Sequence, residues 1–170
     1  MQLNHSGIPQ SVGLFRRLGA LLYDALLLLA VLFFASLPIV VPFNIVYGHR
    51  FYPIYVFYVY VIGFFFLGWF WTHGGQTLGM RAWRIRLQYI NGQPITWKWA
   101  LYRFISVLVF WLPAAAGYLF FQATYKQFIY VWIAPIIADY LWCFFNSDRL
   151  ALHDVLSQTR LVRIPSDTQR

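Results

Sequence analysis

The stretch GLFRRLGALLYDALLLLAVLFF, residues 13–34, decides the fold class of this chain. After its two arginines almost every residue is apolar, and the run is long enough to cross a bilayer, which needs about 20 such residues. A single aspartate, Asp24, interrupts the run seven positions after Arg17. Because an ionisable side chain in a span normally faces protein or water, we expect Asp24 to face the interior of a helix bundle.

The composition of the whole chain also indicates a membrane protein. Of its 170 residues, 61% are hydrophobic, 22% are aromatic and only 11% are charged, whereas soluble domains carry about 25% charged residues. The formal charge of +8 could indicate nucleic acid. The apolar runs instead favour a lipid bilayer as the partner, with arginines on the cytoplasmic side and no nucleic acid bound. The length suits a single domain covering residues 1–170.

Four segments are predicted to span the membrane, at about residues 18–41, 54–71, 104–121 and 128–145. The first run is longer than the apolar core of a signal peptide, so we interpret it as a retained span. The last two segments have only a short link between them and should form an antiparallel hairpin. All thirteen Lys and Arg residues except Arg50 and Lys126 would then lie on one side. This asymmetry predicts that both termini are cytoplasmic.

Two short segments outside the spans have the pattern of β-strands. In residues 83–89 apolar and polar side chains alternate, as in a half-buried strand, and Asn91–Gly92 is a turn signal. Residues 160–164 have strand-like composition and could pair with them, although a single amphipathic interfacial helix is the alternative. The predicted fold class is therefore an all-α membrane protein with four transmembrane helices and a small cytoplasmic β-hairpin or strand pair.

Two aspartates inside the spans are the candidate proton or ion site. Asp24 and Asp139 should lie at similar depth, each a few residues from the cytoplasmic end of its span. Two carboxylates that lie close together do not both ionise readily, which is how a site for a proton or cation can be built. The alternative is structural, with each aspartate bonded to an arginine, a serine or a backbone group between helices. For Asp24, Asp139 and Arg17 are the first partners to consider.

Charged residues at the cytoplasmic surface suggest two further roles. Arg17, at the mouth of the first span, and Asp154, near the C-terminus, are predicted to form a charge-assisted pair. The basic residues of the central loop are candidates for contact with lipid headgroups or a partner protein: Arg81, Arg84 and Arg86.

Other motifs suggest no chemistry. The loop GGQTLGMRAWRIRL, residues 74–87, lacks the ending of a phosphate-binding loop and is interpreted as a tight turn with close backbone approach at Gly75 and Gly79. The adjacent His153 and Asp154 have no Ser or Cys nucleophile in a triad context. The four histidines are scattered along the chain. We therefore expect no catalytic residue, no metal site and no cofactor.

Three segments together resemble the RDD family of small bacterial membrane proteins: RRLGALLYD (16–24), GGQTLGMRAWRIRLQYINGQPI (74–95) and ALHDVLSQTRLV (151–162). The arginine and two aspartates that give the family its name match Arg17, Asp24 and Asp154. Met80 departs from the pattern, because the family commonly has a lysine there. The resemblance implies an uncharacterised protein of the bacterial cytoplasmic (inner) membrane. Transport has been suggested for the family, with sodium–proton exchange linked to some members, and other RDD domains act as partners of larger membrane complexes.

Two functions follow as hypotheses. In the first, the protein is a transport component for a monovalent cation or a proton, using Asp24 and Asp139. In the second, it is a non-catalytic scaffold or accessory subunit that binds other membrane proteins or anionic lipid. One copy with four short spans is small for a complete transporter, so a homo-oligomer or a larger membrane complex is expected in either case.

Overall fold

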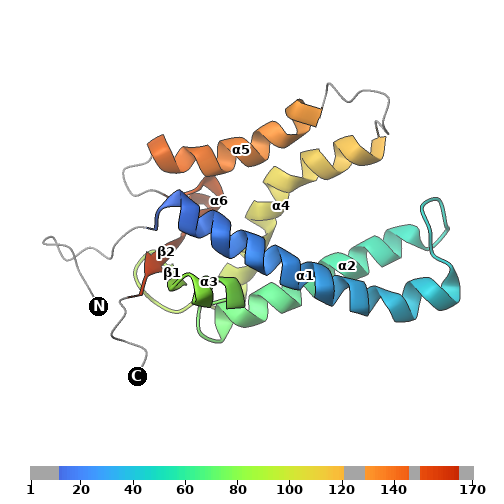
Figure 1. Ribbon diagram of the computed structural model, residues 1–170, viewed down its shortest axis with the longest axis horizontal. Coiled ribbons are helices and arrows are strands. Elements are labelled where there is room, and N and C mark those ends of the chain that lie inside the picture. Colours follow the sequence, from blue (N-terminus) through green and yellow to red (C-terminus); the bar gives the residue numbers. More distant parts are fainter. Residues whose placement is uncertain (1–11, 121–128, 146–149, 165–170) are drawn as a thin grey trace, which may run out of the picture.

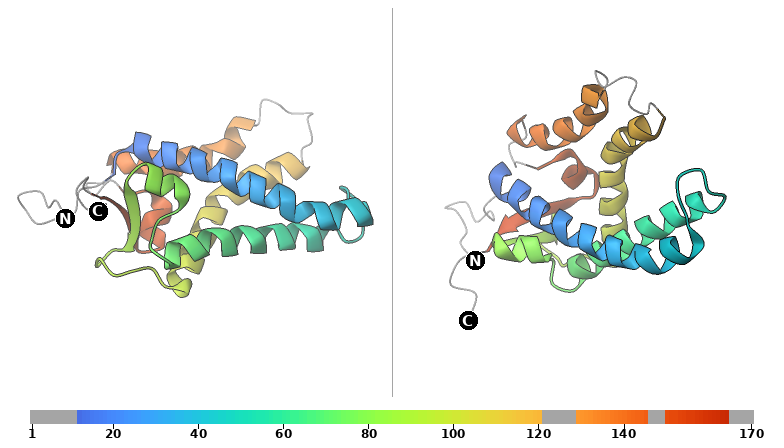
Figure 2. Two further views of the ribbon diagram at one scale, coloured as in Figure 1. Left: turned by 60° about the horizontal axis from the view of Figure 1, so that its bottom comes forward. Right: turned by 45° about the vertical axis from the view of Figure 1, so that its right-hand side comes forward.

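The computed structural model describes residues 12–120, 129–145 and 150–164. Its elements, in chain order, are α1 (Leu14–Phe43), α2 (Tyr52–Thr72), α3 (Leu78–Ala82), β1 (Ile85–Tyr89), α4 (Trp97–Phe120), α5 (Ile129–Phe145), α6 (Leu152–Leu156) and β2 (Thr159–Arg163). The long helices form two antiparallel pairs, α1 with α2 and α4 with α5 (Figure 1). The short elements α3, α6, β1 and β2 gather at the end where α1 begins and α2 ends (Figures 1 and 2), and we call them the surface module.

Helices α1 and α2 are both long and apolar enough to cross a membrane. The 30 residues of α1 correspond to about 45 Å at 1.5 Å per residue, which exceeds the hydrocarbon thickness. Both helices extend past the predicted spans at each end, because hydropathy indicates where the lipid begins and not where the backbone hydrogen bonds begin. Helix α1 continues through Pro38 and Pro42 to Phe43 and is followed by Asn44, whose φ of 47° is left-handed, a conformation that asparagine tolerates.

The segments predicted as the third and fourth spans fall on helices α4 and α5, and their crossing of a membrane stays a prediction. Helix α4 begins seven residues before the predicted boundary, because its first two turns carry Lys98 and Arg103 and are helical without being apolar throughout. The predicted boundary residues 121 and 128 lie outside the described residues. Helices α4 and α5 lie side by side and antiparallel, as the hairpin prediction required (Figure 2).

The two predicted strands are confirmed, and they pair with each other. Strands β1 and β2 are antiparallel, with Ile85 opposite Arg163 and Leu87 opposite Leu161. They form a strand pair and not a hairpin, and the single-helix alternative is wrong. Strand β1 begins two residues later than predicted, because Arg84 has a left-handed φ of 54°. The turn at Asn91–Gly92 is present, with the Gly92 amide donating to the Tyr89 carbonyl at 2.8 Å, but it leads into a loop and not into a second strand.

The compact core lies between the surface module and the adjoining ends of the long helices. Its central side chains on β1, Ile85 and Leu87, are at most 1% exposed, and they pack with Ala20 of α1, Trp71 of α2 and Met80 of α3. Helix α3 was not predicted, because five residues are too few for a 3.6-residue periodicity to be recognised. The core joins the sheet to both apolar helices, and so determines where the polar side chains of this end meet.

Candidate functional site

The predicted contact between Arg17 and Asp154 is present and buried. The Arg17 guanidinium donates from Nη1 to Asp154 Oδ2, and its Nε donates to the Val12 carbonyl at 3.2 Å. Relative exposure is 4% for Arg17 and 0% for Asp154. The pair therefore joins the first turns of α1 to α6 without access to water.

A second arginine, Arg103, completes this contact. The sequence analysis used it only as one of the basic residues predicted to be cytoplasmic. Arg103 of α4 donates from Nη1 to Asp154 Oδ1 and to Thr159 Oγ1, each at 2.6 Å. Asp154 also accepts from the Ala151 amide at 3.3 Å, which caps the start of α6. The signal that could have identified Arg103 was its place inside a helix, because a buried arginine needs a carboxylate.

Asp139 pairs with a histidine and not with Asp24. Its Oδ2 lies 2.6 Å from His153 Nδ1, and its Oδ1 accepts from the His153 amide at 2.9 Å. His153 Nε2 in turn lies 3.2 Å from Arg103 Nη2. Sequence reasoning treated His153 only as the neighbour of Asp154, because the fold, and not the spacing, brings α5 against α6. Arg17, Arg103, Asp139, His153 and Asp154 together form one buried group, which we call the polar network.

The electrostatics of the polar network keep Asp154 ionised. Burial disfavours the charged form of this carboxylate, but the neighbouring Arg103, His153 and Arg17 outweigh that effect. They hold the pKa of Asp154 well below its usual value of 3.8. A carboxylate this strongly committed to two arginines is a fixed counter-ion and is unsuited to exchanging protons near neutral pH.

Asp24 faces the protein interior, as expected, and its partners come from the surface module. Thr77 Oγ1 donates to Asp24 Oδ2 at 2.5 Å, and the Gly79 amide donates to Oδ1 at 2.9 Å. The first partners considered, Asp139 and Arg17, are not bonded to it. The correct partners were missed because a backbone amide and a threonine carry no charge pattern in the sequence. Asp24 therefore anchors α3 to the N-terminal half of α1.

The contact between α1 and α3 depends on the absence of a side chain at Gly79. A Cβ at this position would lie 2.4 Å from the Ala20 carbonyl oxygen and 2.9 Å from the Asp24 carboxylate. This is the close backbone approach that the glycine pattern predicted. The Gly75 prediction also holds, because its φ is +69° and a Cβ there would lie 2.3 Å from the Leu87 carbonyl oxygen.

The two carboxylates predicted to form an ion site have separate partners. Asp24 bonds to α3 and its N-terminal flank, whereas Asp139 bonds to α6. Within the described residues, no three His, Cys, Asp or Glu side chains gather as metal ligands would. The positions of Asp24 and Asp139 therefore suit bonding between helices better than they suit one shared cation site.

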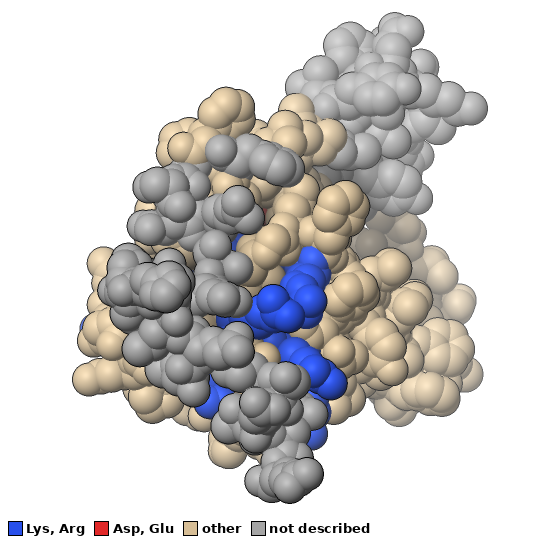
Figure 3. Space-filling view, turned by 60° about the vertical axis from the view of Figure 1, so that its left-hand side comes forward, with Lys and Arg blue, Asp and Glu red and all other residues tan. Residues whose placement is uncertain are grey.

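The basic residues of the central loop remain at the surface. Arg81, Arg84 and Arg86 are all exposed, and none of their side chains makes a hydrogen bond or ion pair within the described part of the chain. Figure 3 shows basic side chains gathered on the face beside the surface module, with no acidic side chain visible among the described atoms. All three described aspartates are buried and bonded elsewhere, so no described carboxylate compensates the positive charge of this face.

The fold and the polar network define a small helical protein with two apolar, membrane-type helices and a compact polar end stabilised by one arginine–aspartate group. A sequence model of the RDD family matches residues 11–158, and the chain belongs to the RDD family. The match covers Arg17, Asp24 and Asp154 together. No curated protein and no solved structure matches the chain.

Proposed function

We propose that this protein is a four-span protein of the bacterial cytoplasmic membrane, with both termini in the cytoplasm, and that it acts as a non-catalytic scaffold or accessory subunit. The observation that carries this proposal is that Asp24, Asp139 and Asp154 are all buried and bonded inside the protein. Aspartates whose carboxylates are bonded within the protein stabilise its fold. They leave the exposed surfaces to make the contacts with other molecules.

The polar network supports a rigid scaffold because it connects elements that are far apart in the sequence. Asp154 contacts Arg17 of α1 and Arg103 of α4, and Asp139 of α5 contacts His153 of α6. Buried charges that are paired tolerate few alternative arrangements, since separating two of them leaves both without that partner. The surface module is thereby held at a defined position under the helices.

The exposed surface offers two kinds of contact. One face of α1 is apolar and exposed along several turns, as shown by Leu22, Leu26, Leu29 and Phe33, each at least 59% exposed. Such a face suits acyl chains or the spans of another membrane protein, in a homo-oligomer or a larger complex. The exposed arginines of the central loop suit an anionic surface.

Reporter fusions test the proposed topology. Fusions after Arg50 and after Lys126 should report the outside, and fusions after Asn91 and after Arg170 should report the cytoplasm. The physical reason is that Lys and Arg are retained on the cytoplasmic side, and only Arg50 and Lys126 of the thirteen fall between the proposed outer ends of the spans. A cytoplasmic signal at Lys126 would contradict the crossing of α4 and α5.

Transport of a monovalent cation or proton stays a prediction, and flux measurements separate it from the scaffold function. In proteoliposomes with a pH gradient, the scaffold function predicts that wild type, Asp24→Asn and Asp139→Asn all give the flux of protein-free liposomes. Asp24→Asn should instead lower thermal stability in detergent, by about 1–3 kcal/mol, because the Thr77 and Gly79 donors lose a charged acceptor. Tyr23→Phe, at the exposed neighbouring position, is the matched control and should change neither property.

The outcome that contradicts the scaffold function is equally defined. It is a wild-type flux above the protein-free level that Asp24→Asn or Asp139→Asn abolishes while the variant still folds. Asp139→Asn is the more informative of the two, because Asp139 bonds to His153 and thereby to the rest of the polar network.

A further inference from the structure

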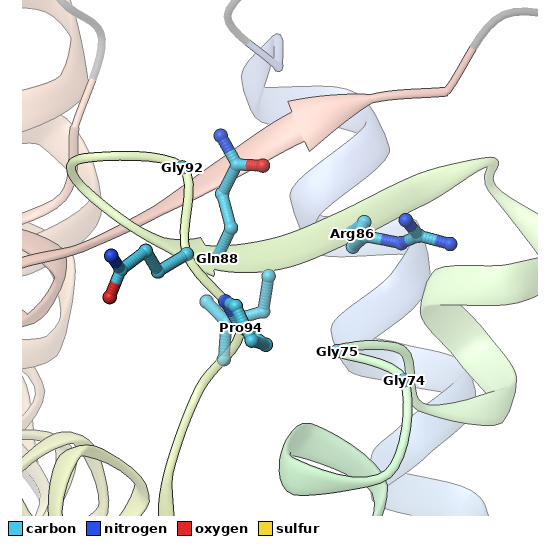
Figure 4. Close-up of a pocket in the computed structure, with 8 residues that line it drawn as sticks. Gly74, Gly75, Arg86, Gln88, Gly92 and Pro94 are labelled. Atoms are coloured by element: carbon cyan, nitrogen blue, oxygen red, sulfur yellow. The ribbon is translucent and has the colours of Figure 1, made fainter.

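A pocket of about 270 Å³ opens beside β1. It is lined by Gly74 and Gly75 after α2, by Arg86, Leu87 and Gln88 of β1, and by Gly92, Gln93 and Pro94 of the following loop. Figure 4 shows Arg86 beside the Gly74–Gly75 turn, with Gly92 and Gln88 on the other side. A Cβ added at Gly74 or Gly92 would meet nothing within 4 Å, so the glycines leave backbone uncovered at the pocket wall.

Arg86 gives this pocket a free positive charge. Its side chain is exposed, packs 3.2 Å from the position a Cβ would take on Gly75, and makes no ion pair or hydrogen bond within the described residues. No described aspartate is available to it, because Asp24, Asp139 and Asp154 are all buried and bonded. A guanidinium in this state is a ready partner for the planar oxygens of a phosphate group.

The position of the pocket indicates which kind of molecule would bring a phosphate group to it. Gly74 and Gly75 follow directly after α2, which ends at Thr72 and is one of the two helices suited to cross a membrane. Two exposed tryptophans mark the same level, Trp69 near the end of α2 and Trp97 at the start of α4. Tryptophans at the ends of spans lie among lipid headgroups. The wall at Pro94 adds apolar contact that a free phosphate would not use.

We infer that this pocket binds the headgroup of one anionic phospholipid, with Arg86 pairing with its phosphate and the glycine turn accommodating its polar group. The inference rests on the membrane topology of the proposed function and names one partner of the surface module. This specific site differs from a general attraction of arginines to an anionic leaflet, because a single arginine and a defined set of pocket residues would hold one lipid.

The test is native mass spectrometry of detergent-purified protein titrated with phosphatidylglycerol or with phosphatidylcholine. Wild type should retain one phosphatidylglycerol in preference to phosphatidylcholine. Arg86→Ala should weaken this binding about fivefold or more. Gln93→Trp should weaken it similarly, because an indole at this exposed pocket residue fills the space without removing charge. Arg163→Ala is the matched control, since Arg163 is an exposed arginine of the same sheet outside the pocket, and it should bind as wild type does.

Three results would overturn the assignment. Equal weakening by Arg163→Ala and Arg86→Ala would mean that binding depends on overall charge. Unchanged binding in Gln93→Trp would place the lipid elsewhere. Competition by inorganic phosphate or glycerol 1-phosphate at the same concentration as the lipid would mean that the site takes a soluble phosphate. Thermal stability of each variant is measured alongside, and the reporter fusions test the topology independently, so failure of this site is distinguishable from failure of the proposed function.

Discussion

Asp154→Ala should lower the free energy of unfolding in detergent by about 3–5 kcal/mol, because it leaves two buried arginines without their shared carboxylate. Arg17 and Arg103 are each 4% exposed, so water cannot replace the lost partner. The measurement is the unfolding transition in mixed micelles, followed by tryptophan fluorescence. Asp154→Asn should lose nearly as much, because an amide keeps the shape of the side chain but not its charge.

A double-mutant comparison tests whether the loss comes from the pair itself. The variant carrying both Arg17→Ala and Asp154→Ala should be much more stable than the sum of the two single losses predicts, since the contact between the two residues can be lost only once. Arg16→Ala is the matched control, because Arg16 is the preceding residue and, within the described part of the chain, its side chain bonds only to the Trp83 carbonyl at 3.3 Å. Additive losses for Arg17 and Asp154 would show that their contact contributes little.

The lowered pKa of Asp154 adds a pH dependence to the same measurement. A carboxyl group whose native pKa lies below its unfolded value contributes stability that is present above the unfolded value and is lost as the pH falls toward the native one. The contribution of Asp154 should therefore be constant from neutral pH to about pH 4 and decline below it. The Asp154→Asn variant should lose less stability than wild type as the pH falls below about 4. An equal loss in wild type and in Asp154→Asn would mean that other groups cause it.

Gly79→Ala should separate α3 from α1 and is the second large effect that we expect. Its new Cβ would lie 2.4 Å from the Ala20 carbonyl oxygen, and the backbone of α1 cannot move aside as a side chain can. The shift also weakens the bond from the Gly79 amide to Asp24. Overpacking of this kind costs about 1–3 kcal/mol, and the lost bond adds to it. Thermal unfolding in detergent measures the loss.

Two other glycines provide a graded comparison for Gly79. A Cβ at Gly19 would lie 2.3 Å from the Trp83 ring, but this ring is 39% exposed and can rotate away. A Cβ at Gly13 would meet nothing within 4 Å, and its φ of −66° suits alanine. Destabilisation should therefore decrease from Gly79→Ala to Gly19→Ala to Gly13→Ala. A Gly19 effect as large as that of Gly79 would contradict the distinction between backbone and side-chain contact.

Periodicity and hydropathy predicted the elements of this fold because both are local properties. The long apolar runs locate α1 and α2, and alternation over 83–89 locates β1, since each depends only on neighbouring residues and on the period of the backbone. The Arg17–Asp154 contact was predictable for a related reason. Both residues were predicted to lie at the same cytoplasmic level, and an arginine at the mouth of a span requires a carboxylate.

The partners of the other polar residues were decided by tertiary packing. Asp24 bonds to Thr77 and to the Gly79 amide, because the missing Cβ of Gly79 lets α3 lie against α1. Asp139 bonds to His153 and not to Asp24, because α6 packs against both α4 and α5. Depth along a helix follows from the sequence, but the rotation of each helix and the distance between helices depend on which small residues allow close approach. Those contacts are non-local, and they determine which charges meet.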